Sequence, residues 1–467
     1  MDKYKRLLSN TAILGIGTVT SKLLVLLLLP VYTECLTKAE YGVADIITQS
    51  ANLLMPLISL GICEAVFRYT LDTANDRREV LTTGFVIILF GLGVMLALYP
   101  LLETIEFFDG YMWLIILYAF CANLHSLFAQ YIRARGMNTF FAAQGLIATA
   151  IVITLNILFL VVFKIGLVGY VLSVVISDIV ASLLIFRLVR LDYAIRPRFW
   201  NPVLVKTMLR YSVPLIPTTV FWWITNVSDR FMITGYIGDD VNGLYTAAFK
   251  IPTMLILLSG IFIEAWQFSA VSEQSPTSRR EHSIFFGKVF DSFQGMLFIS
   301  AAGLIAFSKI FASLLFADDY YVAWQYMPLL IAATVYSSLV TFMGSVYLVD
   351  KKSVLSFVTS FVGALVNVVL NLLLIPTPMG ANGAALATLL SYVVVFAIRA
   401  FNTRKFISFD LHPRKLIINT VVIGVQVVFM IFEISGWIPV QILGVIIIFL
   451  MNCGPILSGC MRMLRRF

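Results

Sequence analysis

Apolar segments about as long as a bilayer-crossing helix recur along nearly the whole chain. A hydrocarbon core about 30 Å thick is crossed by about 20 helical residues, whereas the strands of a membrane barrel have about 10 residues of alternating polarity, which is absent here. The sequence therefore predicts an all-α, polytopic membrane protein with about fourteen transmembrane helices. The expected spans are residues 10–32, 43–67, 80–102, 111–132, 140–163, 167–189, 211–233, 244–270, 285–307, 321–349, 354–375, 381–401, 416–434 and 438–461.

Composition supports a hydrocarbon environment. Hydrophobic residues make up 60% of the 467 residues and charged residues only 12%, about half of the share in a typical soluble domain. In hydrocarbon, a helix satisfies every backbone polar group within its own segment. The net charge of +8 would suggest nucleic acid in a soluble protein. Here the basic residues lie between apolar segments, which indicates membrane lipids and no nucleic acid as partner.

The basic residues also predict an orientation. Alternate loops, beginning with the N-terminus, hold 27 of the 33 Lys and Arg residues, with Arg399 assigned to the loop after the twelfth span. By the positive-inside rule, these loops and both termini are cytoplasmic, and the expected location is the inner (cytoplasmic) membrane of a bacterium. The other loops hold only Lys38, Lys164, Arg230 and Lys309.

An internal repeat divides the chain. Glu64 and Glu264 follow matching Gly residues, and the segments 155–169 and 370–383 share Asn and Gly positions, at offsets of 200 to 215 residues. Six spans per half predict a parallel repeat about an axis along the membrane normal. The alternative is chance similarity among apolar helices. The expected domains are an N-terminal six-helix lobe (residues 1–195), a C-terminal six-helix lobe (196–405) and an extra two-helix hairpin (406–467).

Two short motifs resemble a known family. They are Ser228-Asp229-Arg230-Phe231 followed by residues 243–250, and Asn10-Thr11 followed by residues 38–42. These motifs resemble the polysaccharide transporter family, the O-antigen and exopolysaccharide flippases of the multidrug/oligosaccharidyl-lipid/polysaccharide exporter superfamily. The resemblance implies alternating access between two lobes and undecaprenyl-pyrophosphate-linked oligosaccharide as substrate. It also implies polysaccharide polymerase and chain-length proteins as candidate partners.

Basic residues in or near spans are the candidates for binding a diphosphate headgroup. An intramembrane Lys or Arg is costly unless it faces a wet cavity or a partner. The predicted substrate-binding residues are Lys22, Arg68, Asp229, Arg230 and Lys250. Each has an alternative: Lys22 pairs with Asp45 or Glu64, Lys250 reaches the headgroups, Asp229 and Arg230 lock a helix end, and Arg68 marks a membrane boundary.

Acidic residues within spans are candidates for ion coupling, because a carboxyl group in low dielectric can exchange a proton. The candidates are Glu64, Glu264 and Asp178, and His125 is a possible proton relay. The alternative for each is a structural hydrogen bond. No nucleotide loop, metal-ligand spacing or nucleophile triad occurs in the sequence, so no cofactor and no enzymatic activity are expected.

Two other functions are considered. A multidrug or toxic-cation antiporter of the same fold should offer acids and aromatics in its cavity, rather than Lys22 and Lys250. A membrane-embedded glycosyl-transfer or polymerase protein would need a large loop with catalytic acids. The loops here are short and basic, which argues against the third function.

Overall fold

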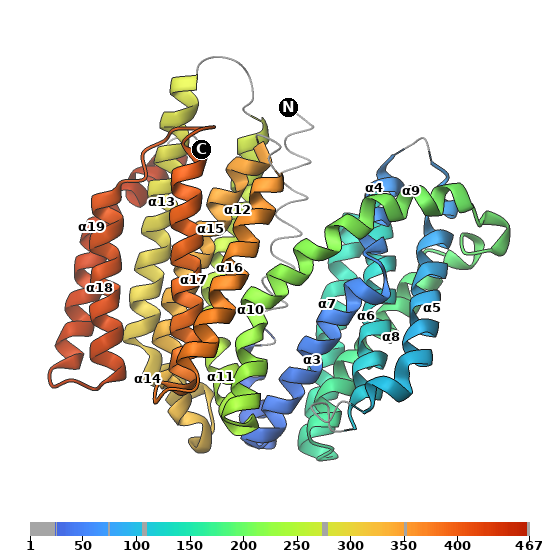
Figure 1. Ribbon diagram of the computed structural model, residues 1–467, viewed down its shortest axis with the longest axis horizontal. Coiled ribbons are helices and arrows are strands. Elements are labelled where there is room, and N and C mark those ends of the chain that lie inside the picture. Colours follow the sequence, from blue (N-terminus) through green and yellow to red (C-terminus); the bar gives the residue numbers. More distant parts are fainter. Residues whose placement is uncertain are drawn as a thin grey trace. The chain divides into compact units, whose positions relative to one another are not determined.

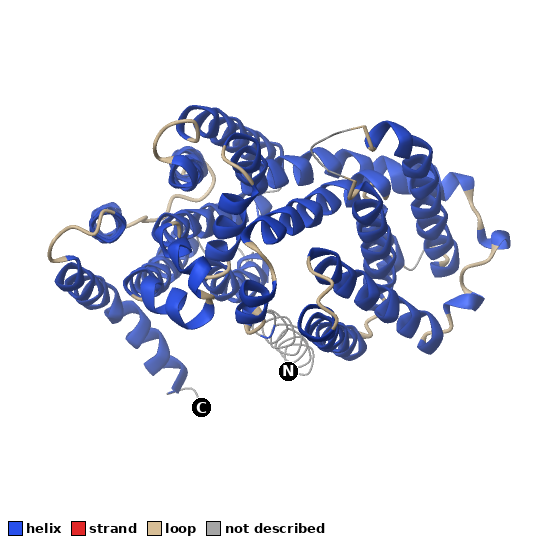
Figure 2. Ribbon diagram, turned by 90° about the horizontal axis from the view of Figure 1, so that it is seen from below, coloured by secondary structure: helices blue, strands red, loops and turns tan. Residues whose placement is uncertain are grey.

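Helices and their connections account for the described chain. The computed structural model describes residues 24, 26–72, 75–104, 110–272, 279–349 and 353–464, without the side chains of 264–265, 267–282, 348–349, 353 and 455–464. Among these residues no strand occurs, and Figure 2 shows only helices and loops. The predicted all-α class is confirmed. Contacts divide the chain into two compact units, Met1–Trp223 and Ile224–Phe467.

The N-terminal unit consists mainly of long helices joined by short connections (Figure 1). Its elements, with the helix α10 that continues into the second unit, are α2 (Leu29–Cys35), α3 (Lys38–Ile58), α4 (Ile62–Leu71), α5 (Arg77–Leu102), α6 (Met112–Ala134), α7 (Asn138–Asn156), the π-helical turn η2 (Ile157–Val162), α8 (Leu167–Leu188), the 3-10 turns η3 (Leu191–Tyr193) and η4 (Pro197–Phe199), α9 (Pro202–Ser212), η5 (Val213–Leu215) and α10 (Ile216–Tyr236).

The C-terminal unit continues with the same kind of helix. Its elements are α11 (Asp239–Phe249), α12 (Pro252–Ser272), α13 (Arg279–Ala306), α14 (Ser308–Leu315), the 3-10 segment η6 (Asp318–Gln325), α15 (Met327–Val349), α16 (Ser353–Leu374), α17 (Gly380–Thr403), α18 (Pro413–Ile431) and α19 (Trp437–Leu464).

Ten described helices are long and apolar enough to cross a membrane, or up to twelve when each of two bent helix pairs counts as one span. The expected first span (10–32) lies mostly outside the described residues. The expected seventh span corresponds to α10, which is helical but carries Asp229 and Arg230 and is not among those ten. The structure therefore has the polytopic helical architecture that the sequence predicts.

Local sequence explains where the second span begins and bends. At the start of α3 the Thr37 hydroxyl accepts a hydrogen bond from the Glu40 N–H, and the Glu40 carboxylate accepts one from the Thr37 N–H. This capping box satisfies two otherwise unpaired donors. The chain then turns at Leu60 and Gly61, and α4 continues at 54° to α3.

The matching helix pair in the second unit, α11 and α12, bends by a smaller angle than α3 and α4. Helices α11 and α12 meet at 42°, and Pro252 opens α12. Proline lacks the N–H that a continuous helix would use, and its ring crowds the preceding turn. Lys250 caps the C-terminus of α11 at this break.

Corresponding helices in the two units have the same packing neighbours. Helix α8 packs against α6 and α7, and α17 packs against α15 and α16. The matched glycines Gly166 and Gly380 stand at the starts of α8 and α17 with φ of 67° and 52°. A positive φ costs glycine little and other residues more. The internal repeat read from the sequence thus has a counterpart in backbone conformation and packing.

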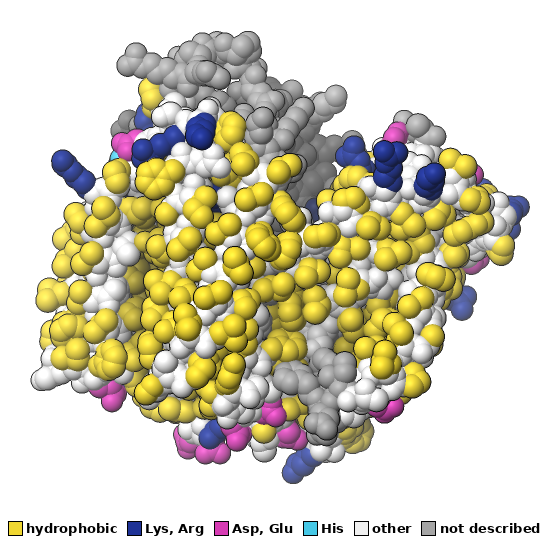
Figure 3. Space-filling view, viewed as in Figure 1, with side chains coloured by type: hydrophobic (Ala, Val, Ile, Leu, Met, Phe, Trp, Pro, Cys, Tyr) yellow, Lys and Arg dark blue, Asp and Glu magenta, His cyan; other side chains and the backbone are white. Residues whose placement is uncertain are grey.

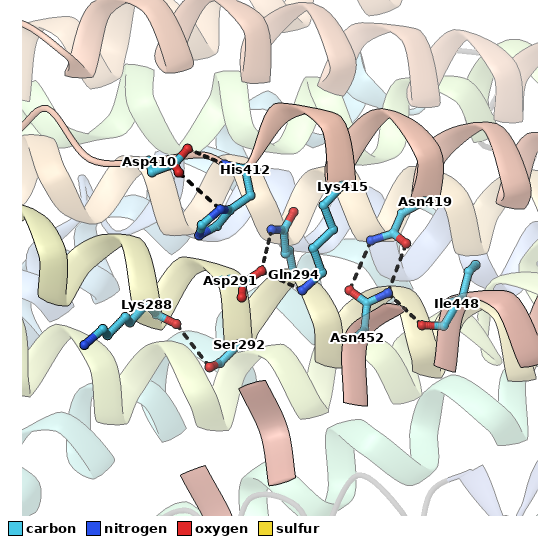
Figure 4. Close-up of polar contacts among 10 residues, drawn as sticks. All are labelled: Lys288, Asp291, Ser292, Gln294, Asp410, His412, Lys415, Asn419, Ile448 and Asn452. Atoms are coloured by element: carbon cyan, nitrogen blue, oxygen red, sulfur yellow. Dashed lines mark hydrogen bonds and ion pairs between the residues drawn. The ribbon is translucent and has the colours of Figure 1, made fainter. Parts of the chain in front are cut away.

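The last two helices are fastened to the second unit by polar contacts (Figure 4). Helices α18 and α19 pack against each other and against α13. The Lys415 ammonium contacts the Asp291 carboxylate at 2.6 Å. Deeper in, the side-chain amides of Asn419 and Asn452 exchange hydrogen bonds of 3.2 and 3.0 Å. Because both amides are buried, these bonds fix how the two helices pair.

The expected boundaries at 195/196 and 405/406 remain predictions. The two compact units meet at Trp223 and Ile224, within α10. The expected hairpin, residues 406–467, contains α18 and α19 and belongs to the second unit.

Candidate functional site

A buried carboxylate and its neighbours form the first candidate site, in the C-terminal unit. Helix α10 carries Asp229 and Arg230, of which only 3% and 6% of the surface is exposed. The Tyr245 hydroxyl on α11 donates a 2.6 Å hydrogen bond to Asp229 Oδ2. The Arg230 guanidinium lies over the Phe249 ring, 4.8 Å from its centroid. The two charges are thus held inside the unit by α11.

Neutral amides and hydroxyls on α16 and α17 bond to one another and to the residues of α10 beside Asp229. The Asn367 amide on α16 accepts from Ser228 (3.1 Å) and from Asn371 (3.0 Å), and it donates to Thr388 on α17 (3.1 Å). One further bond reaches α10, where the Tyr392 hydroxyl on α17 donates to Asn226 Oδ1 at 2.6 Å. We call Asn226, Ser228, Asp229, Tyr245, Asn367, Asn371, Thr388 and Tyr392 the C-terminal polar core. Hydrogen bonds within this core connect α10, α11, α16 and α17.

A histidine–carboxylate pair forms the second candidate site, in the N-terminal unit. His125 Nδ1 on α6 lies 2.7 Å from Asp178 Oδ1 on α8, and His125 Nε2 lies 2.8 Å from Gln144 Oε1 on α7. We call these three residues the N-terminal polar core. The side chains of His125 and Asp178 are 19% and 16% exposed. The pair is therefore mostly enclosed by the three helices.

The His125 ring can have hydrogen-bond partners at both nitrogens in either of two protonation states. With the Gln144 oxygen facing the ring, both ring nitrogens donate, which is the imidazolium form. Turning the amide by 180° would present its NH2 group and suit the neutral ring, with almost no change in shape. The three residues can thus hold or release one proton without repacking the helices.

Lys250, Arg68 and Glu64 are not among the residues of these two cores. Lys250 is half-buried at the break between α11 and α12. Arg68 is exposed near the end of α4, with its guanidinium 5.2 Å from the centroid of the Tyr211 ring. Glu64 is exposed in the first turn of α4. Lys22, and the side chain of Glu264, lie outside the described residues.

The assignment of Arg399 to a loop is wrong. It lies within α17 and is 5% exposed. Its guanidinium donates to Thr359 Oγ1 (3.0 Å), to the Val340 carbonyl (2.8 Å) and to Ser360 Oγ (3.3 Å). Gly344 leaves the room for it, because a Cβ there would stand 2.8 Å from Nη1. Neutral oxygens on α15 and α16 thus replace the water that a loop arginine would contact.

No group of three or more His, Cys, Asp or Glu side chains suited to a metal ion occurs among the residues that the structure describes. In the N-terminal unit the polar core offers a histidine in hydrogen-bond contact with a carboxylate. In the C-terminal unit the polar core offers a buried carboxylate among neutral donors and acceptors.

The family follows from the sequence match. A sequence model of the family described as "Polysaccharide biosynthesis protein" matches residues 7–268, more than half of the chain. The chain belongs to this family. No curated protein matches it in sequence.

Solved transporter structures share the fold. A lipid II flippase, MurJ, in an inward closed conformation matches with a TM-score of 0.70 at 16% identity, over 96% of this chain and all of that one. A multidrug resistance MATE family transporter of the MOP superfamily, in an inward-facing conformation, matches with 0.68 at 14%, over 84% and 98%. A MOP superfamily transporter from Pyrococcus furiosus matches with 0.60 at 14%, over 85% and 95%. The chain is a multi-pass membrane protein with the fold of these transporters.

Sequence reasoning missed most of the polar partners. Gln144, Asn367 and Tyr392 did not stand out, because each is a neutral residue of a type common in such chains. Tyr245 lies within the motif at residues 243–250, but its bond to Asp229 was not foreseen. A usable signal existed: amides within apolar segments, such as Asn367 and Asn371 one helical turn apart, need buried partners in a bilayer. Arg399 had a signal too, since it lies inside the expected span 381–401.

Proposed function

We propose that this protein is a flippase for undecaprenyl-pyrophosphate-linked oligosaccharide, an O-antigen or exopolysaccharide repeat unit, in a bacterial cytoplasmic membrane with both termini cytoplasmic. The observation that carries the proposal is the combination of polysaccharide biosynthesis family membership with a fold shared over 96% of the chain with a lipid II flippase. That relative moves a lipid-linked sugar, and the family name points to the same class of substrate.

Basic residues in or near the expected spans would suit such a substrate. A diphosphate headgroup needs cations in a water-filled path, and Arg binds phosphate through two parallel N–H groups. We assign Arg230, Asp229, Lys250, Arg68 and Lys22 to this path. For Asp229 and Arg230 the alternative stays open, because their contacts with Tyr245 and Phe249 also suit a structural lock.

Ion coupling is assigned to the N-terminal polar core. We propose Asp178 with His125 as the pair that exchanges the coupling proton, because the two side chains are 2.7 Å apart, whereas Glu64 is exposed. A proton bound or released at this pair would change the charge among α6, α7 and α8, and so bias the helices between two arrangements. Glu64 and Glu264 remain further candidates.

The test uses cells depleted of their own flippase, in which lipid-linked repeat units accumulate. The wild-type chain should restore surface polysaccharide, and Arg230→Ala and Lys22→Ala should not, at equal amounts in the membrane. Lys206→Ala serves as control, because Lys206 is an exposed residue of α9. Normal transport by both variants would overturn the cationic path. A wild-type chain that leaves the repeat units accumulated would overturn the flippase proposal.

The rival function is a multidrug or toxic-cation antiporter, and the MATE family likeness supports it. Buried carboxylates at Asp178 and Asp229 would suit a cationic substrate. It predicts drug resistance in cells that express the chain, lost in Asp229→Asn, together with no effect on lipid-linked sugars.

A further inference from the structure

A cavity lined by arginines lies at the end of the N-terminal unit where α5 begins and where α6 and α8 end (Figure 1). Its volume is about 730 Å³. Four arginines line it, Arg77 and Arg78 in the first turn of α5, Arg135 after α6 and Arg190 after α8. Figure 3 shows Lys and Arg side chains gathered at this end of the unit. We call this cavity the arginine pocket.

The floor of the arginine pocket is fixed by buried contacts. Leu191 and Ala194 in the turn after α8 are 1% and 9% exposed. The Thr82 hydroxyl on α5 donates a 2.9 Å hydrogen bond to the Ala194 carbonyl, which ties that turn to α5. Tyr131 on α6 closes another side and is 3% exposed. The pocket is thus a formed concavity of the folded unit, rather than a gap between mobile loops.

Aromatic rings orient three of the arginines. The guanidinium carbons of Arg78, Arg135 and Arg190 lie 5.5, 5.6 and 4.7 Å from the ring centroids of Phe199, Tyr131 and Tyr193. Stacking on a ring face holds the guanidinium plane and leaves N–H groups at its edge for other acceptors. This is the arrangement in which arginine presents paired donors to a phosphate.

The described residues that line the arginine pocket carry four arginines and one carboxylate, Asp76, so positive charge is in excess. Among the described residues, none of these four guanidinium groups forms an ion pair with a carboxylate. Asp76 also lines the pocket, and its carboxylate accepts the backbone N–H of Arg78 as the cap of α5. The start of α5 adds partial positive charge from its backbone N–H groups. An anion with several oxygens would complete the site.

An apolar helix surface runs from the pocket into the membrane-spanning part. In the most apolar stretch of α5 only 17% of the residues are buried within the protein, and many of its large apolar side chains are exposed. They include Val86, Leu89, Phe90, Val94, Leu96, Leu98 and Leu101. A phospholipid-like ligand would place its phosphate headgroup in the pocket and its acyl chains along α5. A free phosphate or diphosphate would occupy the pocket and leave the apolar surface of α5 unused.

We propose that the arginine pocket binds the phosphate headgroup of an anionic phospholipid of the cytoplasmic leaflet, such as phosphatidylglycerol or its two-phosphate relative cardiolipin. The lipid joins the ends of α5, α6 and α8, and two of these helices, α6 and α8, bear His125 and Asp178. The four arginines are not among the predicted substrate residues, so this inference stands or falls without the proposed flippase activity.

The test measures lipid binding to the full-length purified protein in nonionic detergent, by native mass spectrometry. The probes are phosphatidylglycerol, cardiolipin, phosphatidylcholine, inorganic pyrophosphate and undecaprenyl diphosphate, each titrated separately and then in competition. The pocket variant is Arg78→Gln/Arg135→Gln/Arg190→Gln. The control variant, Arg187→Gln/Lys206→Gln/Arg210→Gln, removes the same charge from exposed residues of the same unit that do not line the pocket.

The wild type and the control should retain phosphatidylglycerol or cardiolipin in preference to phosphatidylcholine. In the pocket variant this binding should fall by about tenfold to a hundredfold, since each cation near a headgroup contributes about 1 kcal/mol. Arg135→Lys/Arg190→Lys should lose part of the binding, because lysine keeps the charge without the fork. This milder variant keeps the test valid should the triple variant fold poorly.

Three results would overturn the proposal. Equal losses in the pocket and control variants would mean a general attraction to anionic surfaces. Displacement of the phospholipid by inorganic pyrophosphate at equal concentration would mean a site for the free anion. Displacement by undecaprenyl diphosphate in preference to phospholipid would mean a site for a polyprenyl-diphosphate carrier.

Discussion

The two polar cores occupy related helices and are built differently. The N-terminal polar core has three side chains, of which His125 and Asp178 can change charge. The C-terminal polar core has one carboxylate, Asp229, among hydroxyls and amides. With the repeat offset of 214 residues, Asp178 corresponds to Tyr392, which donates to Asn226 instead of holding a charge.

A second pair of related positions shows the same divergence. Arg399 in α17 corresponds to Ile185 in α8 by that offset, and both are buried, at 5% and 0% exposure. The C-terminal unit accommodates the arginine because Gly344 leaves room and neutral oxygens accept its N–H groups. The comparison teaches that the repeat preserved backbone packing, while each unit acquired its own buried polar groups.

The largest expected effect comes from moving the arginine into the other unit. In Ile185→Arg the guanidinium would be buried in an apolar cluster and would cost about 5 kcal/mol or more, as uncompensated buried charges do. The variant should either fail to accumulate in the membrane or, once purified, show no cooperative transition in thermal unfolding. Leu188→Arg is the matched control, because Leu188 is 67% exposed near the end of the same helix. If Ile185→Arg were as stable as Leu188→Arg, the two units would not differ in their capacity to bury an arginine at this position.

The next effect is expected in the C-terminal polar core. Asp229→Ala removes the acceptor of the Tyr245 hydroxyl and should lower the free energy of unfolding by about 3–5 kcal/mol. Tyr245→Phe removes one neutral partner, and about 1–2 kcal/mol is expected. Both are measured as shifts of thermal unfolding in detergent. If Asp229→Ala is no worse than Tyr245→Phe, the carboxylate is not the centre of this core.

A smaller change in stability, with a separate pH readout, is expected in the N-terminal polar core. Asp178→Ala takes away the partner of His125 and should cost about 1.5–3 kcal/mol, the range for hydrogen bonds to charged groups. If the pair exchanges a coupling proton, His125→Gln should flatten the pH profile of transport that the wild type shows. Gln144→Glu is the companion variant, because it adds a second carboxylate at Nε2. An unchanged pH profile in His125→Gln would leave the pair as a structural bond only.

The smallest effect tests the starts of the two bent helix pairs. Thr37→Ala removes the side-chain cap of α3 and should cost about 1 kcal/mol. In the second unit, α11 follows Gly238 and has no side-chain cap there, so Asp240→Ala in its first turn should cost only about 0.3–1 kcal/mol through the helix dipole. Hydrogen exchange at the first turns of α3 and α11 would report both. Equal losses of hydrogen-exchange protection in the two variants would show that the starts of α3 and α11 do not differ in how they are capped.

Much of the fold could be predicted because bilayer insertion depends on simple local quantities. The lengths of the apolar segments predicted the helices, and the shared Asn and Gly positions predicted a repeat that α8 and α17 show in backbone conformation. The orientation by positive charge remains a prediction. The sites were less accessible: Asp178 and His125 were chosen separately as candidates, without their contact or their link to Gln144.

The sequence by itself determined that this chain is a many-helix membrane protein with two related halves, because segment length, apolarity and repeated residues are properties of the chain alone. Only the tertiary structure decided which polar groups meet, since His125, Gln144 and Asp178 are 19 to 53 residues apart and come together through the packing of three helices. The same holds for Arg399, whose burial depends on space at Gly344 and on oxygens from α15 and α16. A buried polar side chain is stable only where a neighbouring helix supplies its partner, and that partner is fixed by packing.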